Sequence, residues 1–116
     1  MRYVMMICGP ESNWEGPEAE VVMETVNSWW ERWHAAGVIL DGGAELQPVA
    51  TARTVRRGAD GKAVVTDGPY IEIKDVVGGF MLLEADTIDD AIACAATWPG
   101  IEALGDQVEV RPTIER

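Results

Sequence analysis

Two short segments that are apolar at every position constrain the fold of this chain more than any other feature. Residues 3–8 have the sequence Y-V-M-M-I-C, and residues 80–83 have the sequence F-M-L-L. Successive side chains of a β-strand point to opposite faces of the sheet, so both segments place apolar groups on both faces. They are therefore predicted to be the central strands of a sheet that is covered on both sides.

Two amphipathic helices are predicted in addition to these strands. The first spans residues 17–36, with Pro17 near its first turn and Gly37 at its end. Its buried stripe is formed by apolar residues at spacings of three and four, namely Val22, Val26, Trp29 or Trp30, and Trp33. The second begins at Thr87, which is expected to cap it, and ends before Pro99. Its inward face is predicted to consist of Ile88, Ala91, Ala95 and Trp98.

Two further strands and a β-hairpin arm complete the predicted elements. Residues 38–46 form a strand in which Gly42 and Gly43 indicate a bulge or a close backbone approach. Residues 107–111 alternate polar and apolar side chains, which is typical of an edge strand. Residues 51–57 and 62–66 flank the turn G-A-D-G, where Asp-Gly is expected to supply the positive φ angles of a hairpin. This hairpin is an arm inserted into a simpler core.

Without the arm, the order of elements is strand, helix, strand, strand, helix, strand. This is the α+β, ferredoxin-like βαββαβ order, in which the first and third strands are the central pair. Two helices cover only one face of a four-stranded sheet, so the other face would expose a large apolar patch. We therefore expect a homodimer in which two sheets stack face to face. The alternative is that the arm folds back over the uncovered face.

The composition of the chain limits its domain number, its binding partners and its location. A chain of 116 residues with 47% hydrophobic content predicts one domain spanning residues 1–116. A net charge of -11 disfavours direct binding to nucleic acid or to an anionic membrane. The opening apolar run is too short for a signal peptide or a membrane span, which predicts a cytoplasmic protein. Cys8 and Cys94 are expected to be buried free thiols rather than a disulfide.

The sequence contains neither a cluster of metal ligands nor a nucleotide-binding motif. No metal and no cofactor is therefore expected.

The segment 65–75, V-T-D-G-P-Y-I-E-I-K-D, has two interpretations. Its Asp67-Gly68-Pro69 tripeptide has the composition of an ordinary turn. Alternatively, the turn delivers Asp67 to the mouth of a ligand-binding pocket as a general base or hydrogen-bond anchor, with Tyr70 forming a wall. The ligand-binding residues of that pocket would then include Gly68, Pro69 and Tyr70.

Three other side chains are candidates for the same chemistry. Glu72 and Lys74 stand two apart, so in an extended segment they share one face, where they pair with each other or bind a polar ligand. His34 is the one side chain with an ordinary pKa near neutrality, which makes it the candidate proton shuttle; alternatively it is a surface histidine that stabilises a helix C-terminus. Trp29 and Trp30 are adjacent and cannot both face one narrow stripe, so one is expected to reach an interface, a pocket or solvent.

Several segments together resemble the YCII-related proteins, specifically the DGPF-domain branch. They are R-Y-V-M-M-I, G-V-I-L-D-G-G-A-E-L-Q-P, T-V-R-R, T-D-G-P-Y-I-E-I-K-D, G-G-F and the closing V-E-V-R-P, and they cover nearly the whole chain. The family pattern has phenylalanine where this chain has Tyr70. The resemblance implies a dimeric α+β barrel. Arg111, in the closing segment, is a further ligand-binding candidate.

The resemblance implies less about activity. Members of the wider group carry a proposed catalytic His-Asp pair, near the start of the first helix and the end of the second. Here His34 lies at the end of the first helix and the second ends without a carboxylate, so the pair is not carried over. DGPF-type proteins are also often encoded beside extracytoplasmic-function sigma factors, which suggests a regulatory context.

Three functional hypotheses follow. The leading one is a small-molecule-binding homodimer with proton-transfer or elimination chemistry, for which Asp67, Lys74 and His34 are the catalytic candidates. The second is a non-catalytic regulatory module whose arm, residues 51–66, contacts a sigma factor. The third is a family member without catalytic activity.

Overall fold

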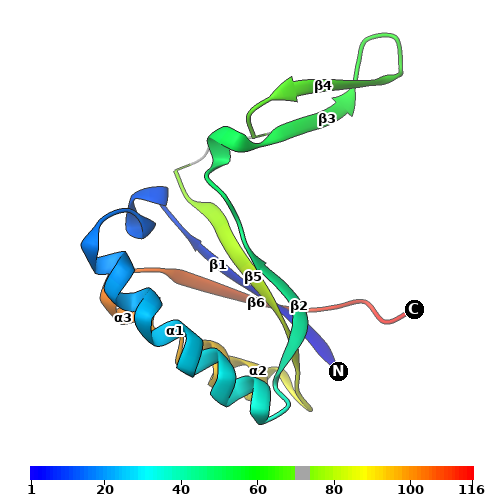
Figure 1. The fold of residues 1–116 in the computed structure, drawn as a ribbon. Coiled ribbons are helices and arrows are strands. Elements are labelled where there is room, and N and C mark those ends of the chain that lie inside the picture. The colour runs from blue at the N-terminus through cyan, green and yellow to red at the C-terminus, as the bar shows by residue number, and fades with distance from the viewer. Residues whose placement is uncertain (70–73) are drawn as a thin grey trace.

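The computed structural model describes residues 1–69 and 74–116. The strands are β1 (Arg2–Gly9), β2 (Ile39–Glu45), β3 (Arg53–Arg57), β4 (Ala63–Asp67), β5 (Val76–Glu84) and β6 (Gln107–Pro112). The α-helices are α1 (Pro17–Ala35), α2 (Ile88–Ala95) and α3 (Gly100–Leu104), and two short 3-10 helices are η1 (Glu11–Trp14) and η2 (Val49–Thr51). The predicted α+β, ferredoxin-like order with an inserted hairpin is confirmed (Figure 1).

Four strands form one antiparallel sheet in the order β2-β5-β1-β6. The central pair is β1 and β5, the two strands that contain the fully apolar segments. Their register places Tyr3 opposite Leu83 and Met5 opposite Met81. The outer strand β2 loses regular pairing with β5 between Leu40 and Ala44, which includes the glycine pair that predicted a bulge or close approach.

The helices lie together on one side of this sheet (Figure 1), and the core fills the space between the two layers. Met5 and Leu83, at the centre of the sheet, are fully buried. Trp29 of α1 meets Trp98 edge to face, with ring centroids 5.2 Å apart, and donates its Nε1–H to Thr97 Oγ1 at 2.8 Å. These contacts hold α1 against the end of α2.

The opposite face of the sheet carries the other half of the apolar side chains. Opposed residues of antiparallel strands share a face, so Val4 lies beside Leu82, and Met6 lies beside Phe80. These four side chains are half-buried, although the helices lie on the other side of the sheet (Figure 1). The open face is therefore a continuous apolar stripe across the central strands.

The arm, β3 and β4, is a separate two-stranded sheet that extends away from the four-stranded sheet (Figure 1). The radius of gyration is 16.1 Å, whereas a compact domain of this length would have about 13 Å. The extended arm accounts for the larger radius of gyration. The arm does not fold back over the open face (Figure 1).

Three local predictions need correction. Ile88 was predicted to face inward but is exposed, and Cys94 takes its place in the core. In the turn of the arm only Gly61 has a positive φ angle, whereas Asp60 instead accepts a hydrogen bond from the Lys62 backbone N–H at 3.0 Å. The short helix α3 follows α2 and was not predicted.

Most other predicted features are as the sequence indicated. The Thr87 hydroxyl caps α2 by accepting a hydrogen bond from the Asp90 N–H at 3.2 Å. Cys94 is a buried free thiol as predicted, whereas Cys8 is free but only half-buried, on the open face, although it was predicted to be buried. Among the described residues, no helix is long and apolar enough to cross a bilayer.

Candidate functional site

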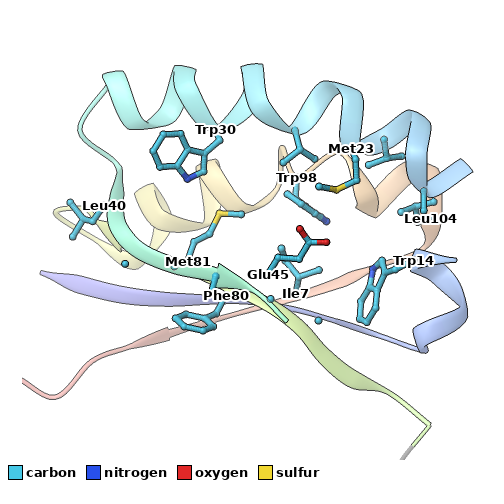
Figure 2. A pocket seen from close by; sticks show the side chains of 18 of the residues that line it. Ile7, Trp14, Met23, Trp30, Leu40, Glu45, Phe80, Met81, Trp98 and Leu104 are labelled. Atoms are coloured by element: carbon cyan, nitrogen blue, oxygen red, sulfur yellow. The ribbon is translucent and has the colours of Figure 1, made fainter. Parts of the chain in front are cut away.

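A cavity of about 320 Å³ lies between α1 and the β2 side of the sheet (Figure 2). Apolar and aromatic side chains form most of its wall, including Ile7, Trp14, Met23, Trp30, Met81 and Trp98. A volume near 300 Å³ with mostly apolar walls is typical of small-molecule sites. The described part of the chain thus contains a cavity that is partly open to solvent and large enough for an organic ligand.

Glycines in β5 create the floor of this cavity. Gly79 pairs with Ile7 of β1 and Glu45 of β2, so it occupies a position that would otherwise point a side chain toward the helices. A Cβ atom on Gly79 would lie 3.1 Å from Ala44 O, so Gly79 lets the β2 backbone approach β5. A Cβ atom on Gly78 would lie 2.6 Å from the Trp14 ring, so Gly78 lets this indole approach the strand. The two glycines therefore allow the β2 backbone and the Trp14 indole, which both line the cavity, to lie close to β5.

A buried carboxylate holds two of the indole rings in the cavity wall. Asp106 Oδ1 accepts hydrogen bonds from Trp14 Nε1 at 3.0 Å and Asn13 Nδ2 at 3.1 Å, and Asp106 Oδ2 accepts one from Trp98 Nε1 at 2.9 Å. Asp106 is 4% exposed, and its hydrogen bonds compensate for its removal from water. Gly100 belongs to this arrangement because a Cβ atom there would overlap the carboxylate.

The charged groups of the cavity are two carboxylates on β2. Glu45 projects into the space between the helices and the sheet, near Trp98 and Met23 (Figure 2), and is exposed at its open side. Asp41 lies beside His34, near the α1 C-terminus. The lining residues include no lysine, arginine or histidine. The cavity therefore combines apolar walls with negative charge alone.

His34 lies at the rim of the cavity and contacts two of its lining residues. Its Nε2 atom is 3.1 Å from Asp41 Oδ1, and its ring stacks on Trp30 with a centroid separation of 4.3 Å. The sequence identified His34 as the candidate proton shuttle but did not predict Asp41 as its partner. The structure thus places a solvent-exposed histidine-carboxylate pair beside the cavity.

The residues predicted around the D-G-P turn lie elsewhere. Asp67, at the end of β4, is 91% exposed and pairs with Arg53 Nε at 3.1 Å. Gly68 has a φ angle of +87° and donates its N–H to Ala52 O at 2.8 Å, so the turn closes the base of the arm. Lys74 is exposed. None of these residues, nor Pro69, is among the residues that line the cavity.

Three other candidates have different outcomes. Tyr70 and Glu72 lie outside the described residues. Arg111 faces the open side of the sheet, opposite Val4, and its Nη2 atom lies 2.7 Å from Glu109 Oε2. A joint role for Asp67, Lys74 and these residues stays a prediction.

The principal residues that sequence reasoning missed are Trp14, Glu45 and Asp106. The available signals were the two glycine pairs, which marked the strands where the cavity forms, and the excess of tryptophan. Trp30 does reach a pocket, which confirms the expectation for one of the two adjacent indoles. Within residues 1–69 and 74–116, no three His, Cys, Asp or Glu side chains gather closely enough to hold a metal ion.

Comparison with known proteins places the chain in a family. The model of the YCII-related domain matches residues 1–115. The chain belongs to the YCII-related family. It is also 31% identical over 115 residues to the uncharacterized protein R00369 of Rhizobium meliloti (strain 1021), a match that covers 97% of this chain and 91% of that protein. The resemblance to the YCII-related proteins is thus confirmed, and the assignment to the DGPF-domain branch stays a prediction.

Proposed function

We propose that this YCII-related protein binds a small organic molecule in the cavity between α1 and β2, and that it does so as a homodimer. The cavity itself carries the proposal, because about 320 Å³ of space is bounded by indole and thioether groups and has carboxylates on one side. Concave sites of this size with mostly apolar walls are where small molecules ordinarily bind. The bulky side chains around this volume are held apart by named contacts, which supports a preformed ligand site.

A substitution that fills the cavity tests this proposal. Met23 of α1 points into the space (Figure 2), so Met23→Trp would occupy part of it. A library of small aromatic and aliphatic molecules is screened by ligand-observed NMR, and hits are measured by calorimetry. We expect binding to the parent protein and at least a tenfold weaker affinity for Met23→Trp.

Val21→Trp is the matched control, because Val21 lies on the same helix, is 61% exposed and does not line the cavity. Equal loss of affinity in both variants would assign the effect to α1 in general. A library without any hit, or hits that bind Met23→Trp as well as the parent, would overturn the proposal.

The homodimer is supported by the apolar stripe on the open face. Val4, Met6, Phe80 and Leu82 lie side by side there, and no described helix covers them. Sheet-on-sheet packing of two copies would bury these side chains across a two-fold axis. Light scattering should therefore give the mass of a dimer, and Met6→Asp should give a folded monomer. A monomeric parent protein at high concentration would refute this part.

Proton transfer is a second candidate function, favoured by the His34–Asp41 pair at the cavity rim. A carboxylate that contacts one imidazole nitrogen fixes the tautomer, so that the other nitrogen can take up a proton. For a ligand found in the screen, exchange of its C–H protons in D₂O reports this chemistry. His34→Gln should abolish exchange while the ligand still binds; unchanged exchange would exclude the role.

The regulatory alternative depends on the family context and on the arm as contact region. A pull-down that recovers a sigma factor with the full chain, and loses it when the arm is shortened, would support that alternative over ligand binding.

A further inference from the structure

We infer that the ligand of this cavity is an organic cation with an apolar body, such as a protonated or quaternary amine that carries a ring or a short chain. The inference rests on the proposed function, because it names the chemical class that the same cavity would bind. Three features support the inference: the negative charge of the cavity lining, the indole rings in the cavity wall and the net negative charge of the protein.

The lining provides charge of one sign only. Asp41 and Glu45 are the charged residues among those that line the cavity, and both are carboxylates of β2. Asp41 is 88% exposed and has His34 as its partner, so Glu45 is the carboxylate without a basic neighbour among the lining residues. An anionic ligand would meet like charge at Glu45, whereas an ammonium group would gain an opposite charge. Glu45 is the better placed of the two, since its carboxylate lies within the space and Asp41 lies beside His34 (Figure 2).

Three indoles supply a second attraction for a cation. Trp14, Trp30 and Trp98 all line the cavity, and one face of Trp30 is covered by the His34 ring, which leaves its other face for a ligand. Tryptophan faces bind ammonium groups through their negative π surface, and such contacts contribute about 0.5–1 kcal/mol at exposed sites and more when water is excluded. Sites for quaternary ammonium ligands combine this kind of aromatic surface with nearby negative charge.

Asp106 strengthens this arrangement by occupying two of the indole N–H groups. Trp14 and Trp98 donate to its carboxylate at 3.0 and 2.9 Å, so these donors are directed away from a ligand. A ligand that needs hydrogen-bond donors, such as a carboxylate or phosphate, loses both of them. The same bonds hold the rings in place before the ligand arrives, which lowers the entropy cost of binding.

The overall charge acts in the same direction. The chain has twenty acidic and nine basic side chains, and Glu20 and Glu24 lie on α1 in a shallow depression beside the cavity, next to Trp14 and Met23. A negative protein attracts cations and raises their rate of association. The size is also suitable: about 320 Å³ corresponds to roughly ten water-sized groups, the size of a phenyl ring with a short amine chain.

The test uses three probes that share a body and differ in charge. They are 2-phenylethylammonium, the neutral 2-phenylethanol and the anionic 3-phenylpropanoate, and benzyltrimethylammonium serves as a quaternary probe. Calorimetry with the full-length protein at neutral pH and low salt should show that the ammonium probe binds about tenfold more tightly than the alcohol, a difference of about 1.4 kcal/mol. The carboxylate should bind more weakly than the alcohol.

Glu45→Gln tests the origin of this preference, because the amide keeps the shape and removes the charge. We expect the affinity for both cationic probes to fall about fivefold or more, while the affinity for 2-phenylethanol stays unchanged. Glu31→Gln is the control: it makes the same change of charge at an exposed α1 position that does not line the cavity, and it should leave all affinities unchanged.

The inference is overturned if the alcohol or the carboxylate binds as tightly as the ammonium probe, if Glu45→Gln binds the cations as well as the parent does, or if none of the probes binds. Each of these outcomes would refute the preference for cations without refuting ligand binding itself. A neutral or anionic library hit that loses affinity for Met23→Trp would still establish the cavity as a binding site.

Discussion

The helix-covered side of the sheet and the β3–β4 arm are both built from antiparallel strands, yet they are stabilised very differently. At the centre of the sheet, Met5 and Leu83 are fully buried under the helices. On the arm, Val55 and Val65 face each other across the two strands, and each is 65% exposed. An isolated two-stranded hairpin is marginally stable in water because it lacks a second layer.

This difference explains why the Asp67-Gly68-Pro69 turn does not belong to the cavity. The turn residues around Asp67 close the base of the arm, where local backbone conformation determines the sequence. The cavity lies in the body instead, where glycine, indole and carboxylate groups from distant segments meet. A dense run of turn and charged residues thus identified a local structure, whereas the cavity depends on packing.

Matched truncations in the two regions should give the largest difference. Leu83→Ala removes a fully buried side chain and should lower the free energy of unfolding by about 3 kcal/mol. Val55→Ala removes an exposed side chain and should change it by less than about 0.5 kcal/mol. Urea unfolding followed by circular dichroism measures both values. A large effect for Val55→Ala would show that the arm is covered in solution, for example by a second copy.

Removal of the Asp106 carboxylate should have the next largest effect. Asp106→Ala leaves the buried Trp98 N–H without its acceptor and also releases Trp14 and Asn13, so we expect a loss of about 2–3 kcal/mol. Asp106→Asn keeps one oxygen acceptor and should lose less. Asp86→Ala, at an exposed position before α2, is the control. Equal unfolding free energies for Asp106→Ala and the parent would show that the indoles do not depend on this carboxylate.

Hydrogen exchange should separate the two regions without any mutation. Amides of β1 and β5 are paired within the central sheet and should exchange only through global unfolding. Amides of β3 and β4 should exchange through local opening, with protection lower by about 2 kcal/mol or more. Exchange monitored by NMR or mass spectrometry gives both values. Equal protection would indicate that the arm unfolds together with the body.

The reactivities of the two cysteine thiols compare the helix-covered and open faces of the sheet, with a smaller expected effect. Burial raises the pKa of the Cys94 thiol to about 11, and burial, followed by the charges of Glu109 and Asp75, also raises the pKa of Cys8. Since the thiolate is the reactive form, both thiols should react slowly at pH 8, and the reactivity of each should increase as the pH rises above 8.

Cys8 is half-buried on the open face and should react before Cys94, which is fully buried. Alkylation followed by mass spectrometry reports the order. In the proposed homodimer Cys8 should also become more reactive on dilution or in Met6→Asp. If Cys94 reacted first, the assignment of the two environments would be wrong.

Much of the fold follows from periodicity in the sequence. The fully apolar segments identified β1 and β5 as the central strands, and spacings of three and four residues identified the buried face of α1. The glycine pair at 42–43 marked the irregular part of β2. These predictions succeed because a strand or a helix exposes its faces at a fixed period, whatever lies beyond it. The inward position of Ile88 failed because α2 is short and buries Cys94 on its sheet-facing side instead.

By itself, the sequence determined the family, the order of elements and the central position of β1 and β5, because these depend on local pattern. Only the tertiary structure decided the site. Trp14, Glu45 and Asp106 come from three separated segments, and their proximity depends on strand register, on the missing side chain at Gly78 and on the hydrogen bonds of one buried carboxylate. Sequence periodicity does not predict these contacts, because they result from how the helix layer and the sheet pack against each other.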